Sequence, residues 1–187
     1  MRLTSTGTIW ALDLETGGLD PRRDAIIAVG MVPIRDGSIC LGEAWQTLVR
    51  PEGLVRPASI GAHHIVPSEL AGAPALPAVL REIDARLSEA ALLVHGAAID
   101  VAFLRRAHKE RGLKWPAPEV IDTAELLARA GDRRRFLVPH APEPELDLRK
   151  ARRALGLPDY PVHDALSDAI AAAELYLALC YSAPTPR

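Results

Sequence analysis

Cysteine, aromatic residues and long apolar runs are scarce in this sequence of 187 residues. The two cysteines, Cys40 and Cys180, form no Cys-x-x-Cys spacing, which argues against a disulfide scaffold and against a thiolate zinc site. No apolar run approaches the roughly 20 residues that a membrane-crossing helix needs. The first residues also lack the apolar segment of a signal peptide, so we expect a cytoplasmic protein without a membrane partner.

A basic surplus is missing as well, since 22 Lys and Arg face 24 Asp and Glu for a net charge of −2. A protein that coats nucleic acid usually carries such a surplus, and aromatic residues for a base-stacking platform reach only 4%. Four carboxylates that held metal ions would leave a small positive balance, so gross charge does not decide the ligand. The length and the 49% hydrophobic content fit one folded domain over residues 1–187, with a core of about 7–181.

The periodicity of the apolar residues changes along the chain from strand-like to helix-like. Strands are predicted first, with a hairpin turn at Asp36-Gly37, and a short buried strand follows later. The predicted strands are 8–15, 25–34, 39–50 and 91–95, and the predicted helices are 75–89, 100–111, 122–130, 146–156 and 164–181. Pro51 to Gly61 and the proline-rich segment 131–145 are expected to be loops. This order predicts an α/β fold in which helices cover a mixed sheet.

Asp13 and Glu15 are two acidic residues in the otherwise apolar strand 8–15. Because side chains alternate along a strand, both carboxylates project to one side, and Leu12 and Leu14 project to the other. Neighbouring buried anions disfavour joint ionisation, and a divalent cation would remove that cost. The alternative is an exposed strand end with a solvated pair, and the short Asp-x-Glu pattern alone does not decide between them.

Further acidic residues and a histidine occur where two helices begin. Asp100 follows the strand 91–95, and Asp168 lies in the first turns of the helix 164–181, where the helix dipole favours an anion. His163 stands just before that helix. The alternatives are that Asp100 is only a helix N-cap and that His163 is a half-exposed loop residue without a role.

Together these segments resemble the DEDDh group of 3′→5′ exonucleases, which have a ribonuclease H-like fold. The first motif is Asp13-Leu14-Glu15-Thr16-Gly17 with its continuation to residue 30, the second is 95–104, and the third is 163–169. Residues 121–129 resemble the Asp-Thr segment of the group, and the whole resemblance runs from about residue 7 to residue 180. It implies a mixed five-stranded sheet flanked by helices.

The sequence departs from the usual motifs of the group beside the acidic residues, not at them. Gly17 replaces the second threonine of Thr-Thr-Gly, Gly96 replaces an asparagine, and Ile99 replaces a phenylalanine. The loop that usually has His-Gly-Ile-Thr is found as residues 63–66. These differences concern the grip on the substrate more than hydrolysis.

The resemblance implies a catalytic set and its metal ions. Asp13, Glu15, Asp100 and Asp168 would bind two Mg²⁺ or Mn²⁺ ions, and His163 would accept the proton of the attacking water. Oxygen ligands without thiolates suit these ions better than zinc or copper. The expected product is a nucleoside 5′-monophosphate from a 3′ end, with single-stranded DNA as the main substrate. Contacts to the terminal nucleotide are expected from Leu14, Thr16, His63 and Phe103.

Two other functions compete with this one. The first is an exoribonuclease that trims RNA, because acidic residues do not distinguish the two sugars. The second is a non-catalytic nucleic-acid-binding or polymerase-accessory module, which the complete set of acids disfavours. Since the chain ends soon after its last helix, we expect a free-standing enzyme, and a polymerase partner would have to dock on a folded face.

Three basic clusters and the remaining histidines have weaker interpretations. Arg133 to Arg135 are favoured for phosphate contact because they fall in the expected loop, while the clusters in 105–111 and 149–153 are interpreted as solvated helix faces. His95 is expected to hydrogen-bond within the fold. His108 and His140 are interpreted as incidental.

Overall fold

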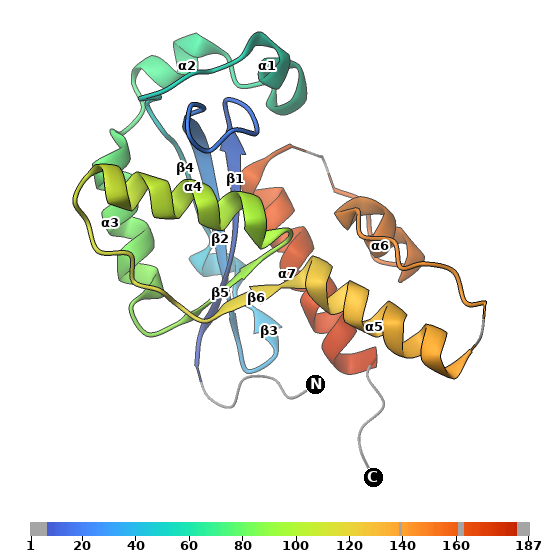
Figure 1. Ribbon diagram of the computed structural model, residues 1–187. Coiled ribbons are helices and arrows are strands. Elements are labelled where there is room, and N and C mark those ends of the chain that lie inside the picture. The colour runs from blue at the N-terminus through green and yellow to red at the C-terminus, as the bar shows by residue number, and fades with distance from the viewer. Residues whose placement is uncertain (1–6, 139, 161–162, 183–187) are drawn as a thin grey trace.

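The centre of the fold is a mixed six-stranded sheet, seen in a computed structural model that describes residues 7–138, 140–160 and 163–182 (Figure 1). The side chains of residues 60, 62, 63 and 182 are outside this description. The strands are β1 (Ile9–Thr16), β2 (Ile26–Arg35), β3 (Ser38–Ile39), β4 (Trp45–Leu48), β5 (Ala91–Val94) and β6 (Val120–Asp122). β1, β5 and β6 run parallel, β2 is antiparallel to β1, and β3 and β4 both pair with the other edge of β2.

Helices cover both faces of this sheet. They are α1 (Pro57–His63), α2 (Pro67–Ala71), α3 (Leu76–Leu87), α4 (Ala97–Glu110), α5 (Thr123–Leu137), α6 (Leu148–Ala154) and α7 (Ala165–Ser182), with a 3₁₀ turn at Leu41–Glu43. α3 and α4 pack on one face, and α7 packs on the other with α5 beside it (Figure 1). Among the described residues, no helix has both the length and the apolar character that a membrane span requires. The predicted α/β class with a mixed, helix-covered sheet is confirmed.

The alternation of β1 decides which side chains reach each face. Three alternate side chains pack against α3 and α4 in the larger of the two main cores: Trp10, Leu12 and Leu14. Ile9 and Ala11 belong to the second core, which is shared with α7. Because the period of a strand is two residues, Asp13 and Glu15 continue onto the α7 face, as the sequence predicts.

The sheet has six strands where five were expected, because the predicted strand 39–50 is divided. β3 pairs up to Ile39 opposite Ile34, and β4 resumes with Trp45 opposite Met31. Residues 40–44 therefore face only residues 32–33 of β2, and the excess forms the 3₁₀ turn. Pro33 lies at this point; its carbonyl accepts the Cys40 N–H, but proline has no N–H to return.

Two predicted loops contain helix. α5 runs on through Gly131 to Leu137, where the sequence predicted a loop from residue 131. A glycine costs a helix interior only about 1 kcal/mol relative to alanine, and the Asp132–Arg135 ion pair spans one turn of the extension. Arg133 to Arg135 thus lie on a helix and not in a loop. In the loop expected between Pro51 and Gly61, α1 begins with Pro57, a residue well suited to the first turn of a helix.

Gly30 allows α7 to touch the sheet directly. It pairs with Asp13 across the β1–β2 ladder. A Cβ atom at Gly30 would lie 2.2 Å from the carbonyl carbon of Ala165 and 2.3 Å from the backbone nitrogen of Leu166. The first turn of α7, which carries Asp168, is therefore held against the strand pair that carries Asp13.

Replacing Gly30 by alanine should push α7 away from the sheet. We expect G30A to lower the free energy of unfolding by about 1–3 kcal/mol, as added atoms do in a packed core, and to lower the melting temperature by several degrees. Circular dichroism during heating measures this. The control is G42A, because no heavy atom lies within 4 Å of the Cβ position there. Equal melting temperatures for the two variants would contradict the close approach.

Candidate active site

Four carboxylates from three elements meet at the carboxyl end of β1. Asp13 and Glu15 come from β1, Asp100 from α4 and Asp168 from α7. The pairing of β1 with β5 stops at Ala11, so the two parallel strands part there, and crevices outside such strand ends are the usual ligand sites of these sheets. A cavity of about 910 Å³ is lined by the first three acids. The fourth lines a neighbouring cavity of about 420 Å³, which also reaches Asp13.

Burial raises the pKa of every one of these acids. The pKa of Asp13 lies well above its usual value because of burial and of the negative charges on Asp100, Asp168 and Glu15. Burial, followed by repulsion from Asp168 and then Asp164, raises the pKa of Glu15 to about 7. Burial also raises the pKa of Asp100 to about 7 and is the main cause of the raised pKa of Asp168. The cluster therefore resists full ionisation unless a positive charge joins it.

Asp100 is fixed in the crevice by the backbone of β1. It is 6% exposed, and its carboxylate accepts a hydrogen bond from the N–H of Leu14, between the other two acids. α4 begins at Ala97, so Asp100 lies inside the first turns of the helix and is not its N-cap. Leu14 is one of the residues expected from the sequence to contact the terminal nucleotide, and its backbone N–H already donates to Asp100.

Asp122 organises the elements around Asp100. Its carboxylate accepts the N–H groups of Gly96 and Ala97 at 2.9 and 2.8 Å, where α4 begins. It also accepts the N–H of Ala124 at 2.9 Å and so caps α5. These hydrogen bonds hold the pKa of Asp122 below its usual value. Asp122 therefore joins the first residues of α4 and α5. The sequence identifies it only as part of the Asp-Thr segment, without a structural role.

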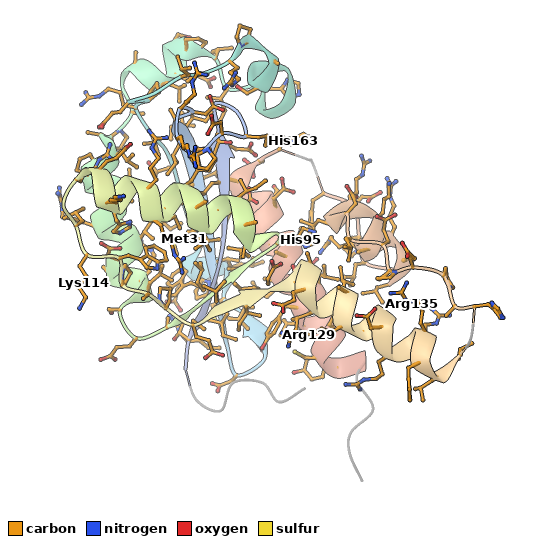
Figure 2. The ribbon with its side chains drawn as sticks, in the orientation of Figure 1. Met31, His95, Lys114, Arg129, Arg135 and His163 are labelled. Carbon is orange, nitrogen blue, oxygen red and sulfur yellow. The ribbon has the colours of Figure 1, made fainter. Side chains whose placement is uncertain are left out.

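His163 stands in front of α7, where the sequence places it (Figure 2). Its backbone N–H donates to the Asp168 carboxylate at 3.1 Å. One ligand atom each from His163, Glu15 and Asp168 lie within 4.8 Å of one another. Asp164 starts α7 by accepting the Ser167 N–H at 2.8 Å, as an N-cap does. The exposed imidazole therefore lies at the edge of the acidic cluster and lines both cavities.

His95 hydrogen-bonds within the fold, and this prediction is confirmed. Its Nδ1 lies 2.7 Å from the Thr123 hydroxyl and its Nε2 lies 2.8 Å from the carbonyl oxygen of Leu146. Burial lowers the pKa of His95. His108, interpreted from the sequence as incidental, is instead fully buried, with Asp84 2.8 Å from its Nε2.

Of the four residues expected to contact the substrate, two line the larger cavity. Leu14 and Thr16 line the larger cavity, and the Thr16 hydroxyl donates to the carbonyl of Gly18 at 2.7 Å. Phe103 is 1% exposed in the larger core and is not among the residues lining this cavity, which does not fit the contact expected of it. The side chain of His63 lies outside the described part of the structure.

Arg152, interpreted from the sequence as part of a solvated face, is buried at 3% exposure. Its guanidinium donates to the carbonyls of Ala171 and Pro158 at 2.7 and 2.8 Å and to the Glu174 carboxylate at 2.7 Å. It also lies over the ring of Tyr160, 4.9 Å from the centroid. This side chain ties α6 to α7 and to the segment that precedes His163.

The donor set fits a hard divalent cation. Carboxylates and the imidazoles of His95 and His163 line the two cavities, no cysteine is among the lining residues, and oxygen-rich sites of this kind suit Mg²⁺ or Mn²⁺. The raised pKa values of the buried acids show the same electrostatic demand. The residues that would hold such ions are Asp13, Glu15, Asp100 and Asp168.

The helix-covered mixed sheet matches the ribonuclease H-like fold, and the four carboxylates lie at the carboxyl end of its first strand. The exonuclease family model, RNase_T, matches residues 10–176. The chain belongs to this exonuclease family, and the resemblance drawn from its motifs is confirmed.

Similar proteins are larger than this chain. It is 34% identical over 173 residues to a DNA polymerase III subunit epsilon-like protein of Rhodobacter capsulatus, covering 92% of this chain and 23% of that protein. It is 32% identical over 171 residues to the PolC-type DNA polymerase III of Thermotoga petrophila, covering 91% and 12%. Zinc-bound exonuclease I of E. coli in complex with single-stranded DNA has the same fold, with a TM-score of 0.82, 19% identity and coverage of 97% and 42%. The chain thus spans a quarter or less of these two curated relatives.

The acidic cluster should make the metal-free protein less stable as pH rises, and a bound divalent cation should offset that loss. The pKa values of Glu15 and Asp100 are raised from 4.5 and 3.8 to about 7. An acid whose pKa is raised by folding stabilises the fold at low pH, and that stability is lost as pH rises through the folded-state pKa. The metal-free protein should therefore lose thermal stability between about pH 4.5 and 7.5. Added Mn²⁺ should raise the melting temperature more at pH 8 than at pH 5.5.

Scanning fluorimetry with EDTA or Mn²⁺ at both pH values measures this effect. The variant E15Q/D100N removes two of the repelling charges and should flatten the pH dependence of the metal-free protein. An equal Mn²⁺ effect at pH 5.5 and pH 8 would show that repulsion in the cluster does not control metal binding.

Proposed function

We propose that this chain is a metal-dependent 3′→5′ exonuclease that hydrolyses the terminal phosphodiester bond of DNA and releases nucleoside 5′-monophosphates. The observation that carries this proposal is that Asp13, Glu15, Asp100, Asp168 and His163 line two neighbouring cavities, both of which contain Asp13 and His163, in a chain that belongs to the exonuclease family. Divalent cations, two Mg²⁺ or Mn²⁺, would supply positive charge to the scissile phosphate there.

His163 is the base in this proposal. Its imidazole is exposed to both cavities and lies close to the carboxylates of Glu15 and Asp168. The hydrogen bond from the backbone N–H of His163 to the Asp168 carboxylate keeps the residue at the edge of the acidic cluster. From this place the imidazole can accept the proton of a water that attacks the phosphate.

The terminal nucleotide would occupy the larger cavity. Leu14, Leu19 and Ile99 supply apolar surface there, and the latter two are exposed side chains. Thr16 lies in the same wall, and its hydroxyl oxygen can still accept a hydrogen bond while donating to Gly18. An apolar wall with a few polar groups suits a base and its sugar.

DNA is the proposed substrate because the similar proteins are DNA enzymes by name. They include an epsilon-like subunit and a PolC-type form of DNA polymerase III, and an exonuclease I that binds single-stranded DNA. These names also make a DNA polymerase the first partner to test by co-purification, in contrast to the free-standing enzyme expected from the sequence.

The function is tested with single-stranded DNA and RNA of one sequence, each labelled at the 3′ end, in Mg²⁺ or Mn²⁺. We expect labelled 5′-monophosphates from DNA, more slowly from RNA, and none in EDTA. Faster release from RNA would establish the exoribonuclease alternative. No release from either substrate would favour the non-catalytic module.

Removing the imidazole should slow turnover without emptying the metal site. We expect H163A to lower kcat by roughly 10²–10⁴, the usual contribution of a positioned base, and to keep the Mn²⁺-dependent rise in melting temperature. Steady-state kinetics and scanning fluorimetry measure the two effects. Unchanged turnover would remove His163 from the role of base.

Removing one acidic charge from the cluster should abolish hydrolysis and keep the fold. In D168N the amide oxygen can still accept the His163 N–H, but the ligand charge is lost. Activity and circular dichroism are measured together, and D132N on the exposed part of α5 is the matched charge control. Retained activity in D168N would contradict the proposed ligand set.

A further inference from the structure

α6 presents three basic side chains beside the catalytic crevice. Arg149, Lys150 and Arg153 are exposed and line the smaller cavity of about 420 Å³. The same cavity reaches Asp13 and Asp168. Asp147 and Asp159 line the same cavity, so three basic and two acidic side chains at α6 lie beside the proposed metal ligands.

The two cavities meet at the catalytic residues and differ in character. Both are lined by Asp13, His95 and His163. The larger one has the apolar side chains of Leu14, Leu19 and Ile99 in its walls, together with acidic residues and Arg56. The smaller one has the basic residues of α6, with Asp147 and Asp159 beside them. A strand that is cut at its 3′ end has one nucleotide on one side of the scissile phosphate and the rest of the strand on the other. Such a strand needs both cavities.

The α6 charges are available to an incoming anion. Arg149 and Arg153 share one partner, the Asp159 carboxylate, at 3.9 and 2.7 Å, and Lys150 lies 3.7 Å from Glu145. Two guanidinium groups carry two positive charges, and the one Asp159 carboxylate neutralises only one of them. Exposed ion pairs of this kind contribute about 0–1 kcal/mol, so a phosphate can replace the carboxylate.

The buried residue of the same cluster fixes the helix that carries these charges. Arg152 points into the fold, where it bonds to Ala171 and Glu174 of α7. Lys150 and Arg153 are thus presented from a helix that is attached to the element carrying Asp168. A fixed spacing between the basic face and the acidic cluster is what a strand crossing both would require.

The other strongly basic cluster does not have this placement. Arg133, Arg134 and Arg135 line neither of the two cavities. Arg135 pairs with Asp132 and Glu143, and Figure 2 shows it on the part of α5 that lies far from His163. The phosphate contact that the sequence favoured for α5 is better supplied by α6.

We propose that Arg149, Lys150 and Arg153 bind the phosphates on the 5′ side of the scissile bond, so that the strand reaches the catalytic crevice over α6. The 3′-terminal nucleotide then lies in the larger cavity. This inference rests on the proposed exonuclease function and adds to it the direction of the strand across the site.

The test compares two substrates over a range of NaCl concentrations. One is a single-stranded DNA of 12 nucleotides, and the other is the p-nitrophenyl ester of thymidine 5′-monophosphate, which has the scissile phosphate but no upstream strand. For R149Q/K150Q/R153Q, the slope of log kcat/KM against log salt on the oligonucleotide should be shallower by about 2. Each phosphate contact on a single strand contributes about 0.7 to that slope. At low salt, kcat/KM on the oligonucleotide should fall about tenfold or more relative to the ester.

The matched control is R133Q/R134Q/R135Q, which removes the same charge from α5 and should keep the wild-type slope. Equal changes in both triple variants would mean long-range attraction and would overturn the inference, as would an unchanged slope in the α6 variant. K150Q alone, expected to reduce the slope by about 0.7, preserves the test if the triple variant unfolds. A wild-type chain that hydrolyses neither substrate would instead refute the proposed function.

Discussion

The repulsion among carboxylates at the carboxyl end of β1 is the interaction on which the rest of the structure depends. Asp13, Glu15 and Asp100 are held close together. Burial raises the pKa of each, and repulsion from Asp100 and Asp168 raises the pKa of Asp13 and of Glu15 further. A fold gains nothing from such a cluster by itself, because ionising it costs free energy. Bound cations would offset that cost, so the same repulsion that weakens the fold would favour the proposed metal site.

The surrounding elements are built to impose this proximity. Gly30 lets the first turn of α7 lie against β2, and the Leu14 N–H draws Asp100 to β1. Asp122 joins the starts of α4 and α5 through three backbone N–H groups. Arg152 anchors α6 to α7 from within. Each contact joins segments that are distant in the sequence, and together they leave the acids little freedom to move apart.

The charge around the crevice is unevenly distributed, and this bears on its chemistry. The net charge of −2 does not show that an acidic centre lies between a cavity with some apolar wall and the basic side chains of α6. An anionic strand would be repelled by the centre alone. If cations bind at the centre as proposed, they and the arginines beside it would give the backbone a favourable path, so local arrangement would outweigh the total charge.

The sequence by itself determined the α/β class, the family and the common face of Asp13 and Glu15, because motif order and a period of two are local properties. The helical spacing of Arg152 after Leu148 and Ala151 also indicates that Arg152 lies on the inner face of α6. Only the tertiary structure decided that the predicted strand 39–50 is divided opposite Pro33 and that Phe103 is buried in the core. It also decided that α6 lies nearer the crevice than Arg133 to Arg135. These outcomes depend on contacts between remote segments, which no local pattern encodes.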